Sequence, residues 1–201
     1  MPNTAIQHPD QSTVFDARTR LKMVTDAVHQ SLHVHPVSIA ILNNGCPKAL
    51  QGFLSAQLSL LQRLEQTAPR AYRAEFDMLK TALCDDLGAE HHARHIAVKG
   101  RAARAGTTYV VLGSLMGRKT LLAAMRRLPD RPFAQSYLTR PMPVDWWRWL
   151  LVELDELAGD DVGWRAVEAA ALTAFEHIEQ AMDGCLKELC KDKGLQQAGL
   201  A

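Results

Sequence analysis

Residues 21–33 read LKMVTDAVHQSLH, and this segment predicts the helix around which the fold is built. Its apolar positions recur at steps of three and four, which gives a helix with one apolar face. That face comprises Leu21, Val24, Thr25, Val28 and Leu32. His29 lies at its border, where an imidazole can point inward, either as a packed and hydrogen-bonded side chain or as a ligand.

A second segment, residues 109–117, reads YVVLGSLMG inside a longer apolar stretch at 107–125 that contains no proline. Gly113 and Gly117 are four residues apart, so in a helix they share one face. Each glycine within a helix costs about 1 kcal/mol relative to alanine, and close approach of another group to the bare backbone is the usual compensation. That group is either a neighbouring helix or a flat ligand, and the spacing leaves both open.

Taken together, the two segments resemble the heme oxygenase family. The first carries L-K-x-x-T-x-x-V-H at residues 21–29, and the second carries the bacterial pattern Y-V-x-x-G-S-x-x-G at 109–117. A weaker likeness lies at 146–157 and 171–175, in the order in which the family places its last helices. The resemblance spans about residues 13–185 and implies an all-α, single-domain bundle that holds heme between its first helix and a glycine-containing helix.

The resemblance implies that His29 is the proximal iron ligand and that Gly113 and Gly117 cover the opposite heme face. A single histidine ligand leaves the sixth iron position open for dioxygen. The implied reaction consumes heme, dioxygen and electrons from a separate ferredoxin or flavin reductase, and it releases biliverdin, carbon monoxide and ferrous iron. Ser114, the third residue expected on the catalytic side, either anchors an ordered water or bonds back to the carbonyl one turn earlier.

Further residues are expected around the heme. They are Arg18, Lys22, Thr25, Tyr109, Arg118, Arg148 and Phe175. Lys22 lies about two helical turns before His29, and Arg18 about one turn further, so both are expected to meet the heme propionates. Arg148, in the late helix, is a weaker choice for the same role.

Three residues depart from the family pattern. Leu112 stands where the bacterial pattern has a glutamate, and Arg118 stands where it has a second glycine. Arg118 can point away from the pocket, reach a carboxylate or crowd the heme face. His33 occupies the position, four after His29, where many members carry an acidic residue that accepts the other ring N–H. These departures favour the alternative function, a heme-binding carrier or sensor without turnover.

The composition excludes some partners. The chain has 201 residues, enough for one domain with a substantial core, and 23 basic against 22 acidic residues give a net charge of +1. No global field therefore favours nucleic acid or an anionic membrane. No apolar run is long enough to span a bilayer and no secretory signal is visible, which predicts a cytoplasmic protein. The four cysteines form no C-x-x-C pair and fit a reducing compartment, while the oligomeric state stays open.

The domain is expected at residues 13–190, with a flexible tail at 1–12 and a polar tail at 191–201. Thr13 and Asp16 have the form of a capping box, which places the start of the first helix near residue 13. No period-two alternation indicates a strand. The predicted helices end before Pro36, cover 50–64, run from Pro69 to near Gly88, cover 107–125 and 133–138, start near Trp146, and follow Gly159 until fraying from Lys187.

The sequence was also searched by pattern for two other kinds of site: a histidine metal site, and the active site of a different all-α enzyme. His91 and His95 are four apart, the spacing that presents two imidazoles to one metal, but such a site needs further carboxylate or thiolate ligands, and the alternative is a solvated basic surface. An all-α scaffold can also serve a thiaminase-like hydrolase or a di-metal oxidase. These functions need a catalytic cysteine with carboxylates or an inward Glu/His set, and neither pattern is visible in the sequence.

Overall fold

The computed structural model of this chain describes residues 16–65, 67–88, 98–126 and 136–198, with side chains described as far as Lys191. Every regular element within these ranges is a helix, which confirms the predicted all-α class. The elements are α1 (Ala17–Val34), α2 (Pro36–Asn44), α3 (Pro47–Leu64), the short 3-10 helix η1 (Arg70–Tyr72), α4 (Arg73–Leu87), α5 (Arg101–Met125), α6 (Ser136–Thr139), α7 (Val144–Ala158) and α8 (Asp161–Ala198).

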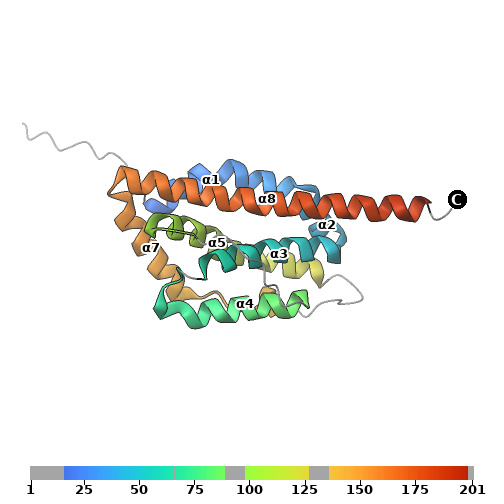
Figure 1. Cartoon of the computed structure of the whole chain (residues 1–201), viewed down its shortest axis with the longest axis horizontal. Coiled ribbons are helices and arrows are strands. Elements are labelled where there is room, and N and C mark those ends of the chain that lie inside the picture. Colours follow the sequence, from blue (N-terminus) through green and yellow to red (C-terminus); the bar gives the residue numbers. More distant parts are fainter. Residues whose placement is uncertain (1–15, 66, 89–97, 127–135, 199–201) are drawn as a thin grey trace, which may run out of the picture.

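The helices are layered, with α3 and α5 in the centre (Figure 1). α8 and α1 run side by side along one face of this layer, and α4 lies along the opposite face. α7 crosses one end and contacts α1, α5 and α8. α8 packs most extensively against α5 and α3, so this long helix ties the central layer to α1.

α1 begins later than the sequence predicts, because Asp16 is itself the N-cap residue. Its carboxylate accepts hydrogen bonds from the backbone amide of Thr19 at 2.9 Å and from the Thr19 hydroxyl at 3.1 Å. These bonds satisfy a free amide of the first turn and lower the pKa of Asp16. Thr13, the other half of the predicted capping box, lies outside the described residues, as do the predicted tail at 1–12, His91 and His95.

Two stretches are helical where the sequence analysis places none. Pro36, interpreted as the boundary of the first helix, occupies the first turn of α2. The His35 ring caps that helix, because its Nδ1 accepts a hydrogen bond from the Val37 amide at 3.2 Å. At the other end of the chain, α8 continues to Ala198, whereas fraying was predicted from Lys187.

The core is one cluster of aliphatic and aromatic side chains to which α1–α8 contribute. Its largest fully buried members include Trp146, Trp164, Tyr137 and Phe76. Leu21 and Thr25 of the predicted apolar face are buried as expected, but Val24 is 39% exposed. Val24 precedes Thr25 by one residue, about 100° around the helix, and this rotation carries it to the solvent side.

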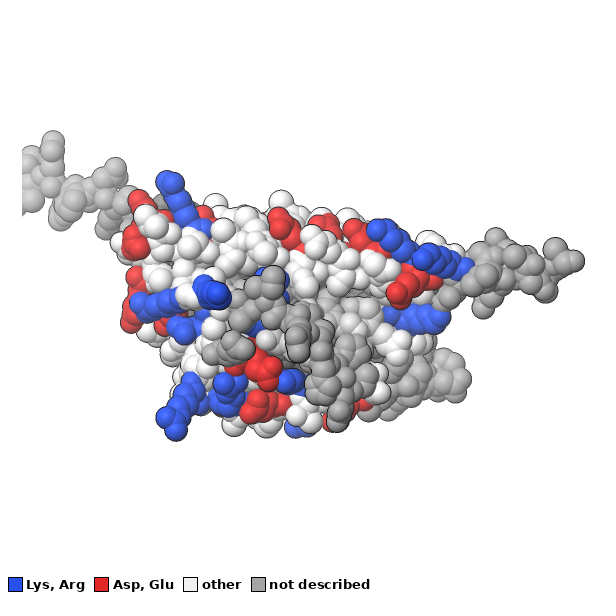
Figure 2. Space-filling view, viewed as in Figure 1, with Lys and Arg blue, Asp and Glu red and all other residues white. Residues whose placement is uncertain are grey.

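The surface carries no large field of one sign on the face shown in Figure 2, where Lys and Arg are interspersed with Asp and Glu. Charged side chains also pair within the fold, since the largely buried Glu153 accepts hydrogen bonds from Arg101 at 2.6 Å and from Arg104 at 3.0 Å. Among the helices described, none is both long and apolar enough to cross a membrane.

The glycines of α5 have different surroundings. A Cβ added at Gly106 would lie 2.9 Å from the Cβ of Ala170 and from the amide nitrogen of Ala171, closer than real Cβ atoms come. The missing side chain therefore lets α5 and α8 touch. A Cβ added at Gly113 or Gly117 has no atom of another residue within 4 Å, apart from chain neighbours and the helix's own backbone. Helix packing, one of the two explanations for this glycine pair, is therefore excluded.

This contrast predicts that a glycine-to-alanine substitution has opposite effects on stability at Gly106 and at Gly113. Gly106→Ala should reduce the free energy of unfolding by about 1–3 kcal/mol, because the new methyl group overpacks the crossing of α5 and α8. Gly113→Ala should increase it by up to about 1 kcal/mol, because alanine is the better helix former and its methyl group enters open space. Urea unfolding of both variants measures this difference, and equal destabilisation of the two would contradict the assigned surroundings.

Candidate functional site

A pocket of about 380 Å³ opens between α1, α2, α3, α5 and α8. Its volume lies within the range of small-molecule sites in proteins, and most of its lining is apolar. Segments far apart in the sequence meet there. The predicted residues that line it are Arg18, Lys22, Thr25, His29, Tyr109, Gly113, Ser114, Gly117 and Phe175.

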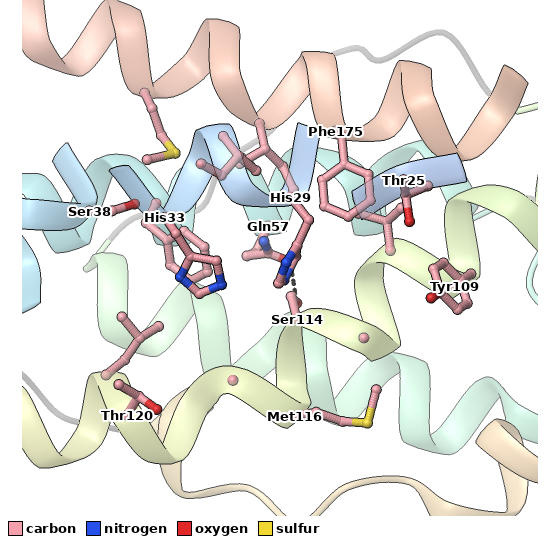
Figure 3. Close-up of a pocket in the computed structure, with 18 of the residues that line it drawn as sticks. Thr25, His29, His33, Ser38, Gln57, Tyr109, Ser114, Met116, Thr120 and Phe175 are labelled. Atoms are coloured by element: carbon pink, nitrogen blue, oxygen red, sulfur yellow. Dashed lines mark hydrogen bonds between the residues drawn. The ribbon is translucent and has the colours of Figure 1, made fainter. Parts of the chain in front are cut away.

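His29 extends from α1 into this pocket, toward α5 (Figure 3). The Phe175 ring of α8 meets it edge-on with the ring centroids 6.0 Å apart, and the His33 ring meets it edge-on at 4.6 Å. Within the described part of the chain, neither ring nitrogen of His29 has a hydrogen-bond partner. The interpretation of His29 as a hydrogen-bonded core residue is therefore wrong, and its ring is free to bind a ligand.

The pKa of His29 lies below the ordinary value of 6.5. Partial burial between the pocket walls is the largest cause, because it disfavours the charged ring. Nearby His33 and Lys22 act in the same direction, while the Asp26 carboxylate opposes them. This shift favours the neutral imidazole, which is the form that binds a metal ion.

Gly113 and Gly117 form the α5 side of the pocket, opposite His29. Because side chains placed there would enter open space, the two glycines leave the α5 backbone bare along this wall. A flat molecule held between α1 and α5 could thus contact main-chain atoms directly. Figure 3 shows this wall below His29, with Ser114, Met116 and Thr120 on the same helix.

Ser114 is bonded within the protein. Its hydroxyl lies 2.7 Å from the carbonyl of Val111, one turn earlier, and 2.8 Å from Oε1 of Gln57 on α3. The first contact is the back-bonded geometry that the sequence analysis gave as one of two alternatives. Gln57 itself was missed as a site residue, although it stands as a glutamine within an apolar stripe of α3, and burial of such a residue is the signal that could have found it.

An aromatic and basic group closes one end of the pocket. The Tyr109 and Trp147 rings stack with their centroids 6.1 Å apart, and the Arg18 guanidinium lies 5.9 Å from the Trp147 ring. Burial raises the pKa of Tyr109, and the Thr25 hydroxyl and Arg18 oppose that shift. Trp147, which the sequence analysis did not assign to the site, therefore holds Arg18 at the pocket mouth.

The structure places two of the three cations predicted for the heme propionates at the pocket and the third elsewhere. Arg18 and the exposed Lys22 both line the pocket. Arg148 does not, since it lies 74% exposed on α7 and pairs with Asp145 at 3.2 Å. Its predicted role at the propionates is therefore not supported by its position.

Arg118 and Leu112, two of the departures from the family pattern, also lie off the pocket. Arg118 follows Gly117 by one residue, and the rotation of about 100° turns it away from the bare wall. Its guanidinium lies near Tyr137, whose pKa burial raises to about 12 against the opposing influence of Ser114 and Arg118. Leu112 is fully buried in the core, so neither residue crowds the α5 wall.

The described residues do not form the sites that a di-metal oxidase or a thiaminase-like hydrolase needs. No group of three or more His, Cys, Asp or Glu side chains among them is arranged to hold a metal ion, as a di-metal oxidase needs. The four cysteines are free thiols, and none lines the pocket, where a thiaminase-like hydrolase would need one.

Comparison with known proteins assigns no function to the pocket. No protein-family model matches the chain, and no curated protein matches its sequence. The features that bear on function are the order of the two motifs and the pocket to which the fold brings both of them.

The surroundings of His29 predict its titration. In the ligand-free protein its pKa should lie below 6.5, so the folded state loses stability as the pH falls through that value, because the unfolded chain binds the proton more readily. His33→Gln should raise the pKa of His29 by removing a nearby positive charge. NMR titration of the imidazole Cε1 proton measures both, with His177→Gln as the control in another part of the molecule. A pKa above 6.5 in the unmodified protein would refute the assigned cause.

Proposed function

We propose that this protein is a heme oxygenase, which uses dioxygen and externally supplied electrons to convert heme to biliverdin, carbon monoxide and ferrous iron. One observation carries the proposal. The His29 imidazole, which has no hydrogen-bond partner among the described residues, faces a wall of bare backbone at Gly113 and Gly117 across one pocket. These are the two walls that the motif resemblance requires of a heme site.

The residues present suit a flat iron macrocycle. His29 would hold the iron through a ring nitrogen, because no hydrogen bond from the described residues competes for that nitrogen. Phe175, edge-on to the His29 ring, limits its rotation on the α8 side. The glycine wall would let the macrocycle lie against main-chain atoms, a position that larger side chains would fill.

The charged rim of the pocket suits the two carboxylates of heme. Arg18 and Lys22 lie on the same face of α1 as His29, and both line the pocket. Trp147 supports Arg18 through its ring, which reduces the conformational freedom the guanidinium loses on binding a carboxylate. We assign these two cations to the propionates.

The protein's own contribution to the reaction is placement and exclusion. When bound, heme supplies both the iron that activates dioxygen and the porphyrin edge that is oxidised. His29 would hold the macrocycle from the α1 side, and the bare α5 wall would limit the space left on the other side. The lining is mostly apolar, so a bound macrocycle would displace water from it. Electrons come from a separate ferredoxin or flavin reductase.

A heme carrier or sensor is the second candidate, and one observation favours it. His33 stands where a carboxylate would orient the His29 ring, and no described residue accepts a hydrogen bond from that ring. Weaker control of ring orientation reduces control of the iron. A carrier would bind heme with His29 but would leave it intact.

Hemin binding and turnover separate the candidates. Hemin added to the purified protein should give a sharp Soret band, which should decay in air with a reductant while a biliverdin band grows. A Soret band that persists would instead identify a carrier, and absence of any hemin binding would remove heme from the function altogether.

The ligand assignment has a matched control within the same helix. His29→Ala should abolish the axial bond, shift the Soret band and reduce turnover to near background. His33→Ala, one turn along the same pocket wall, should keep the spectrum of the unmodified protein. The reverse pattern, with His33→Ala losing the band, would move the iron ligand to His33.

The bare wall can be tested by filling it. Gly117→Leu should leave the fold intact, because its side chain enters open space, but should lower turnover on the order of a hundredfold by displacing the macrocycle. Gly184→Leu is the control, since Gly184 on α8 is equally open but faces a different cavity. Unchanged biliverdin formation by Gly117→Leu would refute the role of the wall.

A further inference from the structure

His29 and His33 form a pair of imidazoles on the pocket side of α1. They are four residues apart, so their side chains share one face of the helix, and both line the pocket (Figure 3). Neither ring is hydrogen bonded to a described residue, and both side chains are exposed to solvent. The pair is therefore accessible to an ion from solution.

The separation of the two rings suits a shared metal ion. Their centroids lie 4.6 Å apart, and their planes are inclined by 81°. Metal–nitrogen bonds of about 2.0–2.1 Å place the ring centroids of two imidazoles on one ion about 4.5–5.3 Å apart, for angles of about 90–110° at the ion. The observed distance falls within this range, so α1 already presents the two rings at the required spacing.

A carboxylate lies on the same side of α1. Asp26 precedes His29 by three residues and lines the pocket, and its carboxylate acts on the His29 ring more strongly than the Lys22 ammonium does. This negative charge favours a cation at the pair. No three His, Cys, Asp or Glu side chains of the described residues are arranged as ligands, so water would complete the coordination. The site is thus open and its ion exchangeable, unlike a closed structural zinc site.

We propose that His29 and His33 together bind a divalent first-row transition-metal ion in the heme-free pocket. Imidazole is a ligand for ions of this class, which includes Fe²⁺, Ni²⁺, Cu²⁺ and Zn²⁺. The inference gives a role to His33, which stands where many members of the resembled family carry an acidic residue. The site needs no heme and does not rest on the proposed function, but it uses His29, so the ion and heme exclude each other. Ferrous iron, which the proposed reaction would release beside His29, belongs to the same class of ion.

Calorimetric titration of the heme-free protein with Ni²⁺ tests the site. The unmodified chain should show a binding event that His29→Ala and His33→Ala each weaken at least about tenfold, because a single imidazole cannot chelate the ion. His95→Ala, which breaks the other histidine pair with this spacing in the sequence, is the matched control and should keep the event. Equal Ni²⁺ affinity of the unmodified protein and His33→Ala would overturn the inference.

Thermal unfolding gives a second readout. Ni²⁺ should raise the melting temperature of the unmodified protein, because it binds the folded state, and should not raise that of His33→Ala. Without Ni²⁺ the two proteins should melt alike, since His33 is exposed and not hydrogen bonded to a described residue, and this comparison shows that the variant is folded. An equal rise in both proteins would contradict a role for His33.

Hemin separates failure of this inference from failure of the proposed function. Ni²⁺ should weaken hemin binding, and the hemin-loaded protein should lack the binding event that depends on His33. Persistence of that event with undiminished affinity would show that His29 is not shared, and would overturn the inference. If the unmodified protein binds Ni²⁺ through both histidines but does not bind hemin, the proposed function alone is overturned. If it binds hemin, and neither His29→Ala nor His33→Ala changes the Ni²⁺ affinity, this inference alone is overturned.

Discussion

The contact of α5 with α8 at Gly106 is the constraint on which the pocket depends. There the two helices touch through bare backbone, so one end of α5 is fixed against Ala170 and Ala171. Two and three turns further along α5, a Cβ added at Gly113 or Gly117 would meet no atom of the other described helices within 4 Å. The helices therefore separate from a point of contact, and the space between them becomes the pocket that α1 closes from the other side.

The pocket combines groups that each reduce the stability of the ligand-free fold. Two helical glycines face open space, a buried amide at Gln57 lacks a partner, and the pKa of His29 is lowered by partial burial. Buried atoms without a hydrogen-bond partner also occur away from the pocket, for example at Tyr137 and Trp146, so the glycine pair and the unpartnered His29 ring are the features that set the pocket apart. Such locally unfavourable features are typical of binding sites, because a bound molecule supplies the missing interactions.

The sequence predicted the helices that carry the site better than the side chains that complete it. Periodicity placed His29 and the glycine pair on helices, and the fold brings both to one pocket. Gln57 was not singled out, although a glutamine within the apolar stripe of α3 is a sequence signal of burial. Arg118, which departs from the family pattern, was expected near the heme, but one residue of helical rotation carries it off the wall. Pro36 was interpreted only as the end of the first helix. Proline also suits the first turn of a helix, and Pro36 starts α2 in this way.

All described residues of the pocket lining belong to α1, α2, α3, α5 and α8. The walls are therefore helices, and no described loop residue lines the pocket. Any widening of the pocket beyond its present opening moves whole helices, and such motions fall in the microsecond-to-millisecond range. The release of a bound molecule that needs such widening therefore depends on the rigidity of the whole bundle. Substitutions far from the pocket can then change its residence time.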